Sequence, residues 1–215
     1  MRDIQPGQAR PRQPRPATAR ERIDHAAYDL FSRHGIRGTG VDAVSARAGV
    51  TKMTLYRYYP SKNHLVLAFL HRREELWSRA WLQRQVEDRA VDPGERLLAI
   101  FDVFDKWFRR NDYEGCSFVK TVLEYGGDDH PIRAATIKHI ANVTVFLREL
   151  ASQAGIRDAE GFAKQWQILM RGSIVAACEG DHAAALRAKK IGRLLLSAAT
   201  SRRTQRIASS RYGDG

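Results

Sequence analysis

The stretch from Asp42 to Tyr59, DAVSARAGVTKMTLYRYY, constrains the fold of this chain more than any other. It predicts two short helices joined by a tight turn at Gly49, because glycine can adopt the left-handed conformation that ends a helix at little steric cost. Thr51 can then cap the second helix through its side-chain oxygen. Leu55 and Tyr59 lie four residues apart, on one face of that helix, and can both turn inward. The pattern is typical of a helix-turn-helix.

The second of these helices carries its polar and aromatic side chains on the outer and end faces: Lys52, Met53, Thr54, Tyr56, Arg57 and Tyr58. Lys52 and Thr54 can donate to base edges, and Met53 can meet a thymine methyl group. Arg57 can read guanine or hold a phosphate. A buried structural helix would not expose these side chains together, so the sequence favours a helix that enters a DNA groove.

The run from Thr39 to Leu65, TGVDAVSARAGVTKMTLYRYYPSKNHL, resembles the DNA-binding signature of the tetracycline-repressor (TetR) family. The resemblance covers about residues 19–70, and a family-like phrase, GCSFVKTVLEY, begins at Gly115. Tyr56 and Lys62 match family positions that grip the DNA backbone, whereas Gly40 stands where the family usually has a capping Ser or Thr. The full set of predicted DNA contacts is Thr39, Thr51, Lys52, Met53, Thr54, Tyr56, Arg57, Tyr58 and Lys62.

The resemblance implies an all-α regulator with a three-helix DNA-binding domain followed by a helical domain for effector binding and dimerisation. Its partners would be double-stranded DNA with a palindromic operator, a second copy of the chain and a small effector that releases the DNA. The implied activity is repression. An effector-independent, architectural DNA-binding protein is the alternative.

The basic charge of the chain lies mostly at its two ends. The formal net charge is +12, of which residues 1–20 carry +4 and residues 201–215 carry +3. Such a charge suits a polyanion. Because the region between the ends is only mildly basic, the motif supports DNA binding better than the total charge does.

Composition and helix signals predict four regions. Residues 1–17 form an Arg- and Pro-rich arm without apolar periodicity, expected to be disordered, which either solubilises the chain or reaches the minor groove. Residues 18–64 form the DNA-binding domain, residues 65–200 the effector and dimerisation domain, and residues 201–215 a disordered basic tail. Helix starts at Thr18, Asp92 and Asp158, and the lack of alternating strand patterns, predict an all-α fold.

Aromatic and soft side chains on the later helices are candidates for an effector cavity. Each one could equally be ordinary core, but together they favour a hydrophobic or aromatic ligand. The predicted ligand-binding residues are Phe101, Phe104, Trp107, Phe108, Phe118, Tyr125, Trp166 and Met170.

Small residues on the last two helices let helices approach closely, which favours a four-helix bundle between two copies. Packing within one chain is the alternative. The predicted dimer-interface residues are Trp166, Gly172, Ser173, Ala176, Ala184, Ala188, Ile191 and Leu195.

No feature of the sequence indicates an enzyme, a metal site or a cofactor. The chain has no HExxH, P-loop or nucleophile elbow, and its histidines lack zinc-like spacing. Two cysteines, Cys116 and Cys178, are too few for a disulfide framework and favour the reducing cytoplasm. No apolar run is long enough to span a bilayer.

Overall fold

The computed structural model describes the backbone of residues 17–126 and 130–210, and side chains throughout these ranges except at 78–80 and 202–210. Every element in these ranges is a helix, which confirms the all-α prediction. In chain order they are α1 (Ala19–His34), α2 (Val41–Ala48), α3 (Lys52–Tyr58), α4 (Lys62–Glu74), η1 (Glu75–Gln83), α5 (Arg84–Glu87), α6 (Pro93–Phe108), α7 (Ser117–Glu124), α8 (Pro131–Gln153), α9 (Ala159–Cys178) and α10 (Ala184–Ser210).

The helices begin where capping residues predict. At the start of α1, Thr18 Oγ1 accepts from the Glu21 amide at 3.2 Å, and the Thr18 amide donates to Glu21 Oε2 at 2.7 Å. This reciprocal pair satisfies two amides that the helix itself leaves unbonded. Asp92 likewise caps α6, and Asp158 caps α9. These contacts confirm the three helix starts predicted from the sequence.

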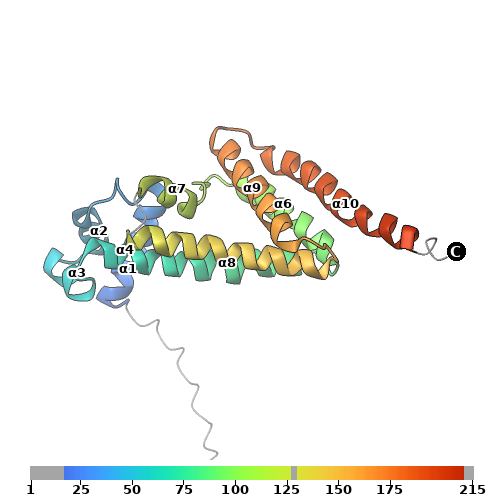
Figure 1. Cartoon of the computed structure of the whole chain (residues 1–215). Helices are drawn as coiled ribbons and strands as arrows, with labels where there is room; N and C mark the ends of the chain where they lie inside the picture. Colours follow the sequence, from blue (N-terminus) through green and yellow to red (C-terminus); the bar gives the residue numbers. More distant parts are fainter. Residues whose placement is uncertain (1–16, 127–129, 211–215) are drawn as a thin grey trace, which may run out of the picture.

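A long rod connects the two ends of the molecule. α4, η1 and α5 follow one another without a break, and α4 lies beside the N-terminal part of α8 along the length of the structure (Figure 1). The sequence predicts one helix ending near residues 84–88, and its end is confirmed. The π-helical turn of η1 was not predicted, because a π-helix has no strong sequence signal of its own.

Two hydrophobic clusters divide the buried residues. The first cluster joins α1–α4 around residues such as Phe31, Leu55 and Phe69, and it also takes in Phe118 and Tyr125. The second cluster joins η1, α5, α6, α8, α9 and α10. The segment around α7 therefore packs on the N-terminal helices, which the predicted boundary at residues 64 and 65 does not anticipate.

The two predicted terminal segments have different outcomes. α10 continues to Ser210, beyond the start of the disordered tail that the sequence predicts at residue 201. Residues 1–16 of the predicted arm and residues 211–215 lie outside the described residues. Within the described ranges, none of the helices combines the length and the apolarity that crossing a membrane requires.

Candidate nucleic-acid interface

The turn between α2 and α3 has the geometry that the sequence predicts. Gly49 has φ 62° and ψ 42°, a left-handed conformation that L side chains rarely adopt. Its amide donates to the Ala46 carbonyl at 3.2 Å, and the Val50 amide donates to the Ser45 carbonyl at 3.1 Å. Thr51 Oγ1 then accepts from the Thr54 amide at 3.1 Å and so caps α3.

Polar contacts from α1 fix the position of this motif. Arg22 Nε donates to the Ala48 carbonyl at 3.0 Å, at the end of α2. Arg47 of α2 forms an ion pair with Asp29 at 2.8 Å. At the end of α3, the Tyr59 hydroxyl donates to Asp24. The inner face of α3 is thus held rigidly, with Leu55 fully buried.

The outer face of α3 carries large side chains without a packing role. Met53 is 82% exposed, an unusual exposure for so apolar a side chain, and Tyr56 and Tyr58 are 39% and 38% exposed. The Arg57 guanidinium lies over the Tyr58 ring, 5.5 Å from its centroid. This contact orients a cation at the end of an exposed helix.

The ammonium of Lys52 has a partner in the free protein. Lys52 Nζ lies 2.9 Å from Asp42 Oδ1, and the hydrogen bond to this carboxylate raises the pKa of Lys52. Both side chains are solvent-exposed, so the pair is weak and Lys52 can exchange Asp42 for a phosphate or a base.

Lys62 stands in the first turn of α4, where its cation and the helix N-terminus can face the same anion. Ser61 caps this helix by accepting from the His64 amide at 3.4 Å. Burial lowers the pKa of Lys62, and nearby Glu124 opposes that shift. Lys62 is therefore partly desolvated, and a phosphate would favour its charged form.

Thr39 does not belong to this surface, and its predicted DNA contact is wrong. The side chain is 3% exposed, and Oγ1 donates to the Gly35 carbonyl at 2.8 Å. Thr39 thus closes the loop after α1. Its place beside the motif in the sequence could not reveal this, because the side chain points back towards α1. Thr51 and Thr54 remain exposed or partly exposed, with their hydroxyls 2.9 Å apart.

Residues 23–69, which contain α2 and α3, match the bacterial regulatory proteins of the tetR family. The chain belongs to the tetR family. The match begins in α1 and ends in α4, so it covers the motif and the two helices that hold it.

Three relatives show how far the similarity extends. An uncharacterised HTH-type transcriptional regulator of Mycobacterium tuberculosis is 30% identical over 110 residues, which cover 51% of this chain and 54% of that protein. The HTH-type transcriptional repressor SCO4008 of Streptomyces coelicolor is 28% identical over 154 residues, which cover 67% and 70%. A crystal structure of SCO4454, a TetR-family regulator of the same species, has a TM-score of 0.75 at 25% identity, covering 84% and 95%. The chain spans about half the length of the M. tuberculosis relative that it matches.

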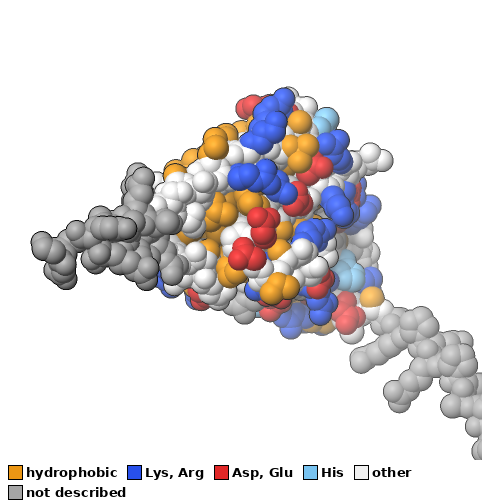
Figure 2. Space-filling view, turned by 90° about the vertical axis from the view of Figure 1, so that its right-hand side faces the viewer, with side chains coloured by type: hydrophobic (Ala, Val, Ile, Leu, Met, Phe, Trp, Pro, Cys, Tyr) orange, Lys and Arg blue, Asp and Glu red, His pale blue; other side chains and the backbone are white. Residues whose placement is uncertain are grey.

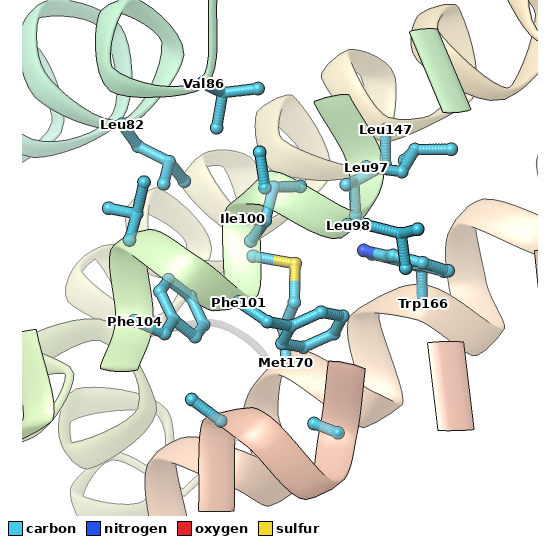
Figure 3. Close-up of a cluster of buried hydrophobic side chains, with 14 of the residues drawn as sticks. Leu82, Val86, Leu97, Leu98, Ile100, Phe101, Phe104, Leu147, Trp166 and Met170 are labelled. Atoms are coloured by element: carbon cyan, nitrogen blue, oxygen red, sulfur yellow. The ribbon is translucent and has the colours of Figure 1, made fainter. Parts of the chain in front are cut away.

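In this tetR-family chain, six of the predicted ligand residues share one buried cluster. They are Phe101, Phe104, Trp107, Phe108, Trp166 and Met170, all at most 8% exposed. Figure 3 labels Phe101, Phe104, Trp166 and Met170 among them. Phe118 and Tyr125 are not brought to them, because α7 packs both residues against the N-terminal helices. The prediction that all eight line one cavity is therefore wrong for these two.

Four of the predicted dimer residues are buried inside the single chain: Trp166, Ser173, Ala184 and Ala188. Their assignment to a surface is wrong, because α10 packs against both α9 and α6 within the chain. Around Gly192, for example, Trp166 and Phe101 lie so close that an added Cβ would clash with the Trp166 ring at 2.8 Å. Gly172 and Ile191 are exposed, and Ala176 and Leu195 are partly exposed.

The exposed apolar side chains on the outer faces of the same two helices were not predicted as interface residues. They are Ile168 and Val175 on α9 and Leu186 and Leu194 on α10, exposed by 69%, 43%, 40% and 72%. Ile168, Gly172 and Val175 recur at the spacing of one helical face, a signal that could have found them.

Proposed function

We propose that this protein is a transcriptional repressor that binds a palindromic DNA site as a homodimer and releases it when a small molecule binds. The observation that supports DNA binding is the exposure of Met53, Tyr56 and Tyr58 on a short helix whose inner face is anchored through Leu55. In the described structure these outward side chains have few contacts of their own, whereas a DNA groove would supply them.

Each outward side chain has a chemical role at the groove. The thioether of Met53 suits a thymine methyl group, and Lys52 donates to guanine or phosphate. Arg57, already oriented over Tyr58, adds a second cation. Residues 17–64 carry eight Lys and Arg against four Asp and Glu, a net charge of +4 that favours the duplex. Repression is supported by the similarity to SCO4008, which is named a repressor.

The exposed apolar face of α9 and α10 supports a dimer. Ile168, Val175, Ile191 and Leu194 together expose a larger apolar surface than single scattered residues would. Figure 1 places α9 and α10 away from α3, so two copies joined there would leave both recognition helices free. Figure 2 views the end opposite α3 and shows hydrophobic side chains at its surface among charged ones. A two-fold axis would set the two α3 helices about 34–36 Å apart on one face of the duplex.

Selection of duplexes from a random pool tests the DNA claim. The wild-type protein should enrich an inverted repeat, and the double variant Lys52→Ala, Arg57→Ala should enrich no sequence. Arg109→Ala is the matched control, because Arg109 is an exposed arginine just after the C-terminal end of α6, outside α2 and α3. Failure of the wild type to retain any duplex in low salt would contradict the proposal.

Substitution of Ile168 tests the dimer face. Ile168→Asp should give a monomer by analytical ultracentrifugation and should weaken DNA binding, because a half-site alone holds one recognition helix. Ile137→Asp is the control, since Ile137 is an isoleucine on α8 that is 46% exposed and lies off this face. A dimer that survives Ile168→Asp, or one that Ile137→Asp breaks, would place the interface elsewhere.

A DNA-binding protein without an effector is a second candidate. The burial of Phe101, Phe104 and Trp166 favours this candidate, because the Phe101 ring packs against the other two rings as in an ordinary core. A screen of aromatic metabolites for changes in melting temperature separates the two candidates.

A further inference from the structure

A cavity of about 330 Å³ lies where the DNA-binding helices meet the rest of the molecule. Its walls come from three parts of the chain: the C-terminal half of α1, the end of α4 with η1, and the end of α6 with the segment that follows it. This volume falls at the lower end of the range for small-molecule sites, about 300–1,000 Å³. The cavity borders the buried aromatic cluster that the sequence indicated and shares Trp107 with it.

Three tryptophans form an apolar wall of this cavity. The ring centroids of Trp77 and Trp107 are 5.5 Å apart, those of Trp77 and Trp81 are 6.0 Å apart, and those of Trp81 and Trp107 are 6.4 Å apart. Trp77 and Trp81 both belong to η1, whose wider π-helical turn presents residues four apart to the same side. Such a wall suits a flat aromatic molecule, because tilted and offset rings pack favourably.

Two buried polar atoms of the residues that line the cavity lack a hydrogen-bond partner among the described residues: Ser32 Oγ and Trp77 Nε1. Ser32 is 5% exposed, so water does not compensate it at the surface. Buried donors without partners are uncommon in folded proteins and cost free energy. Both groups can donate a hydrogen bond, so they fit an acceptor on a bound molecule.

The charges that line the cavity identify the most available cation. Arg33 forms an ion pair with Asp29 at 2.9 Å, and Arg110 pairs with Asp112 at 2.6 Å. Arg73 has no carboxylate partner among the contacts of the described residues. Its Nη1 donates to the Tyr28 hydroxyl at 2.7 Å, and its guanidinium lies over the Tyr28 ring. A guanidinium paired only with a phenol can bind a carboxylate, with two parallel hydrogen bonds.

We propose that this cavity binds a small planar aromatic carboxylate. Its ring lies against Trp77, Trp81 and Trp107, and its carboxylate accepts from Arg73 and from the Ser32 hydroxyl. This inference rests on the proposed ligand control, for which it names a site and a ligand class.

The position of the cavity gives a physical route to control. Tyr28 and Ser32 lie on α1, the helix that holds α2 and α3, whereas Trp77 and Trp107 lie on η1 and α6. A ligand bound between these walls favours the arrangement of α1 and η1 that fits it best. If that arrangement differs from the DNA-bound one, the ligand shifts the population away from DNA. A tenfold loss of DNA affinity requires tenfold tighter ligand binding to the DNA-free state.

Tryptophan fluorescence of the protein without DNA tests the site. Three of the four tryptophans line the cavity, and the variant Trp166→Phe removes the fourth. In this background 1-naphthoate should quench the emission saturably, and the neutral 1-naphthalenemethanol should bind at least tenfold more weakly. The substitutions Arg73→Gln and Ser32→Ala should each weaken 1-naphthoate binding, the former tenfold or more.

The matched control is Arg109→Gln, an exposed arginine outside the cavity, which should bind 1-naphthoate as the parent does. Arg73→Lys keeps the positive charge and controls for a folding defect in Arg73→Gln. It should retain part of the affinity for 1-naphthoate. Absence of saturable quenching, or equal binding by Arg73→Gln and the parent, would overturn the site.

A second measurement separates this inference from the proposed function. The duplex selected by the wild type is titrated with 1-naphthoate, and the DNA should be released by the parent but not by Arg73→Gln. Saturable binding to a protein that retains no duplex would support the site and contradict the proposed function. Saturable binding without release of the duplex would overturn the control exerted through this site.

Discussion

Helices α3 and α6 use similar residue types in opposite ways. α6 buries ten of its sixteen residues, among them Phe101, Phe104 and Phe108, and its side chains contact several other helices. α3 buries only Leu55 of its seven residues and leaves Met53 exposed. A large apolar side chain in a core has a sufficient explanation in packing. One on an exposed helix does not, so exposure points to function where burial cannot.

The largest expected effect is a loss of stability on substitution in α6, with no comparable loss on substitution in α3. Phe104→Ala should lower the free energy of unfolding by about 3–5 kcal/mol, because it removes a fully buried ring and leaves a cavity. Met53→Ala should change it by less than about 0.5 kcal/mol, since the side chain is exposed. Urea unfolding followed by circular dichroism measures both. A similar loss in the two variants would remove the contrast between the helices.

A buried histidine, His139, should make the stability of the protein depend on pH. The His139 ring stacks on Phe118, with centroids 3.4 Å apart, and burial lowers its pKa to about 4, although Glu74 partly opposes the shift. The ordinary value is 6.5, so between these pH values the unfolded chain binds more protons. The free energy of unfolding should therefore fall as the pH drops from 6.5 towards 4, by at most about 1.4 kcal/mol per pH unit.

Unfolding in urea at pH 7 and at pH 5.5 measures this slope. His139→Gln should flatten it, whereas His64→Gln, an exposed histidine of the DNA-binding helices, should leave it unchanged. A slope that persists without His139 would assign the acid sensitivity to other groups.

Within the DNA surface, we expect two kinds of loss. Lys62→Ala and Tyr56→Phe should weaken binding to all sequences about equally, and Lys62→Ala should also reduce the salt slope by about one. Met53→Ala should change the base preference at one position, where a mismatch typically costs about 1–3 kcal/mol. Binding measured across a set of single-base operator variants separates the two patterns. A uniform loss from Met53→Ala would argue against a base contact.

Substitution of the buried Thr39 should have a smaller effect, and it should change stability and not DNA binding. Thr39→Val should cost about 1 kcal/mol of stability, because the buried hydroxyl loses its bond to the Gly35 carbonyl, and the folded protein should bind DNA as before. Thr54→Val should weaken DNA binding with little loss of stability. Fluorescence anisotropy with labelled duplex, read beside urea unfolding, distinguishes them. A loss of DNA affinity in Thr39→Val would instead support a DNA contact by Thr39.

Local signals predicted most of the fold and part of the site. The caps at Thr18, Asp92 and Asp158 and the turn at Gly49 depend on residues within one helical turn, so the sequence is sufficient. The direction in which Thr39 points, the packing of Phe118 on the N-terminal helices and the burial of Ser173 depend on distant partners. No local pattern encodes them. The cavity at Trp77 was not predicted, because it joins residues far apart in the chain.

The smallest expected effect adds a contact to the exposed surface. Gly40 begins α2 without a side-chain cap, at φ −83°, and no atom lies within 4 Å of an added Cβ. Gly40→Ser should therefore be accepted without strain and raise stability by only a few tenths of a kcal/mol. Its hydroxyl, at a helix N-terminus, can bind a phosphate, so affinity for all duplexes should rise modestly. Gly49→Ser is the contrasting control, because its left-handed backbone should make serine cost about 1 kcal/mol or more. Unchanged affinity in Gly40→Ser would place the DNA backbone away from the start of α2.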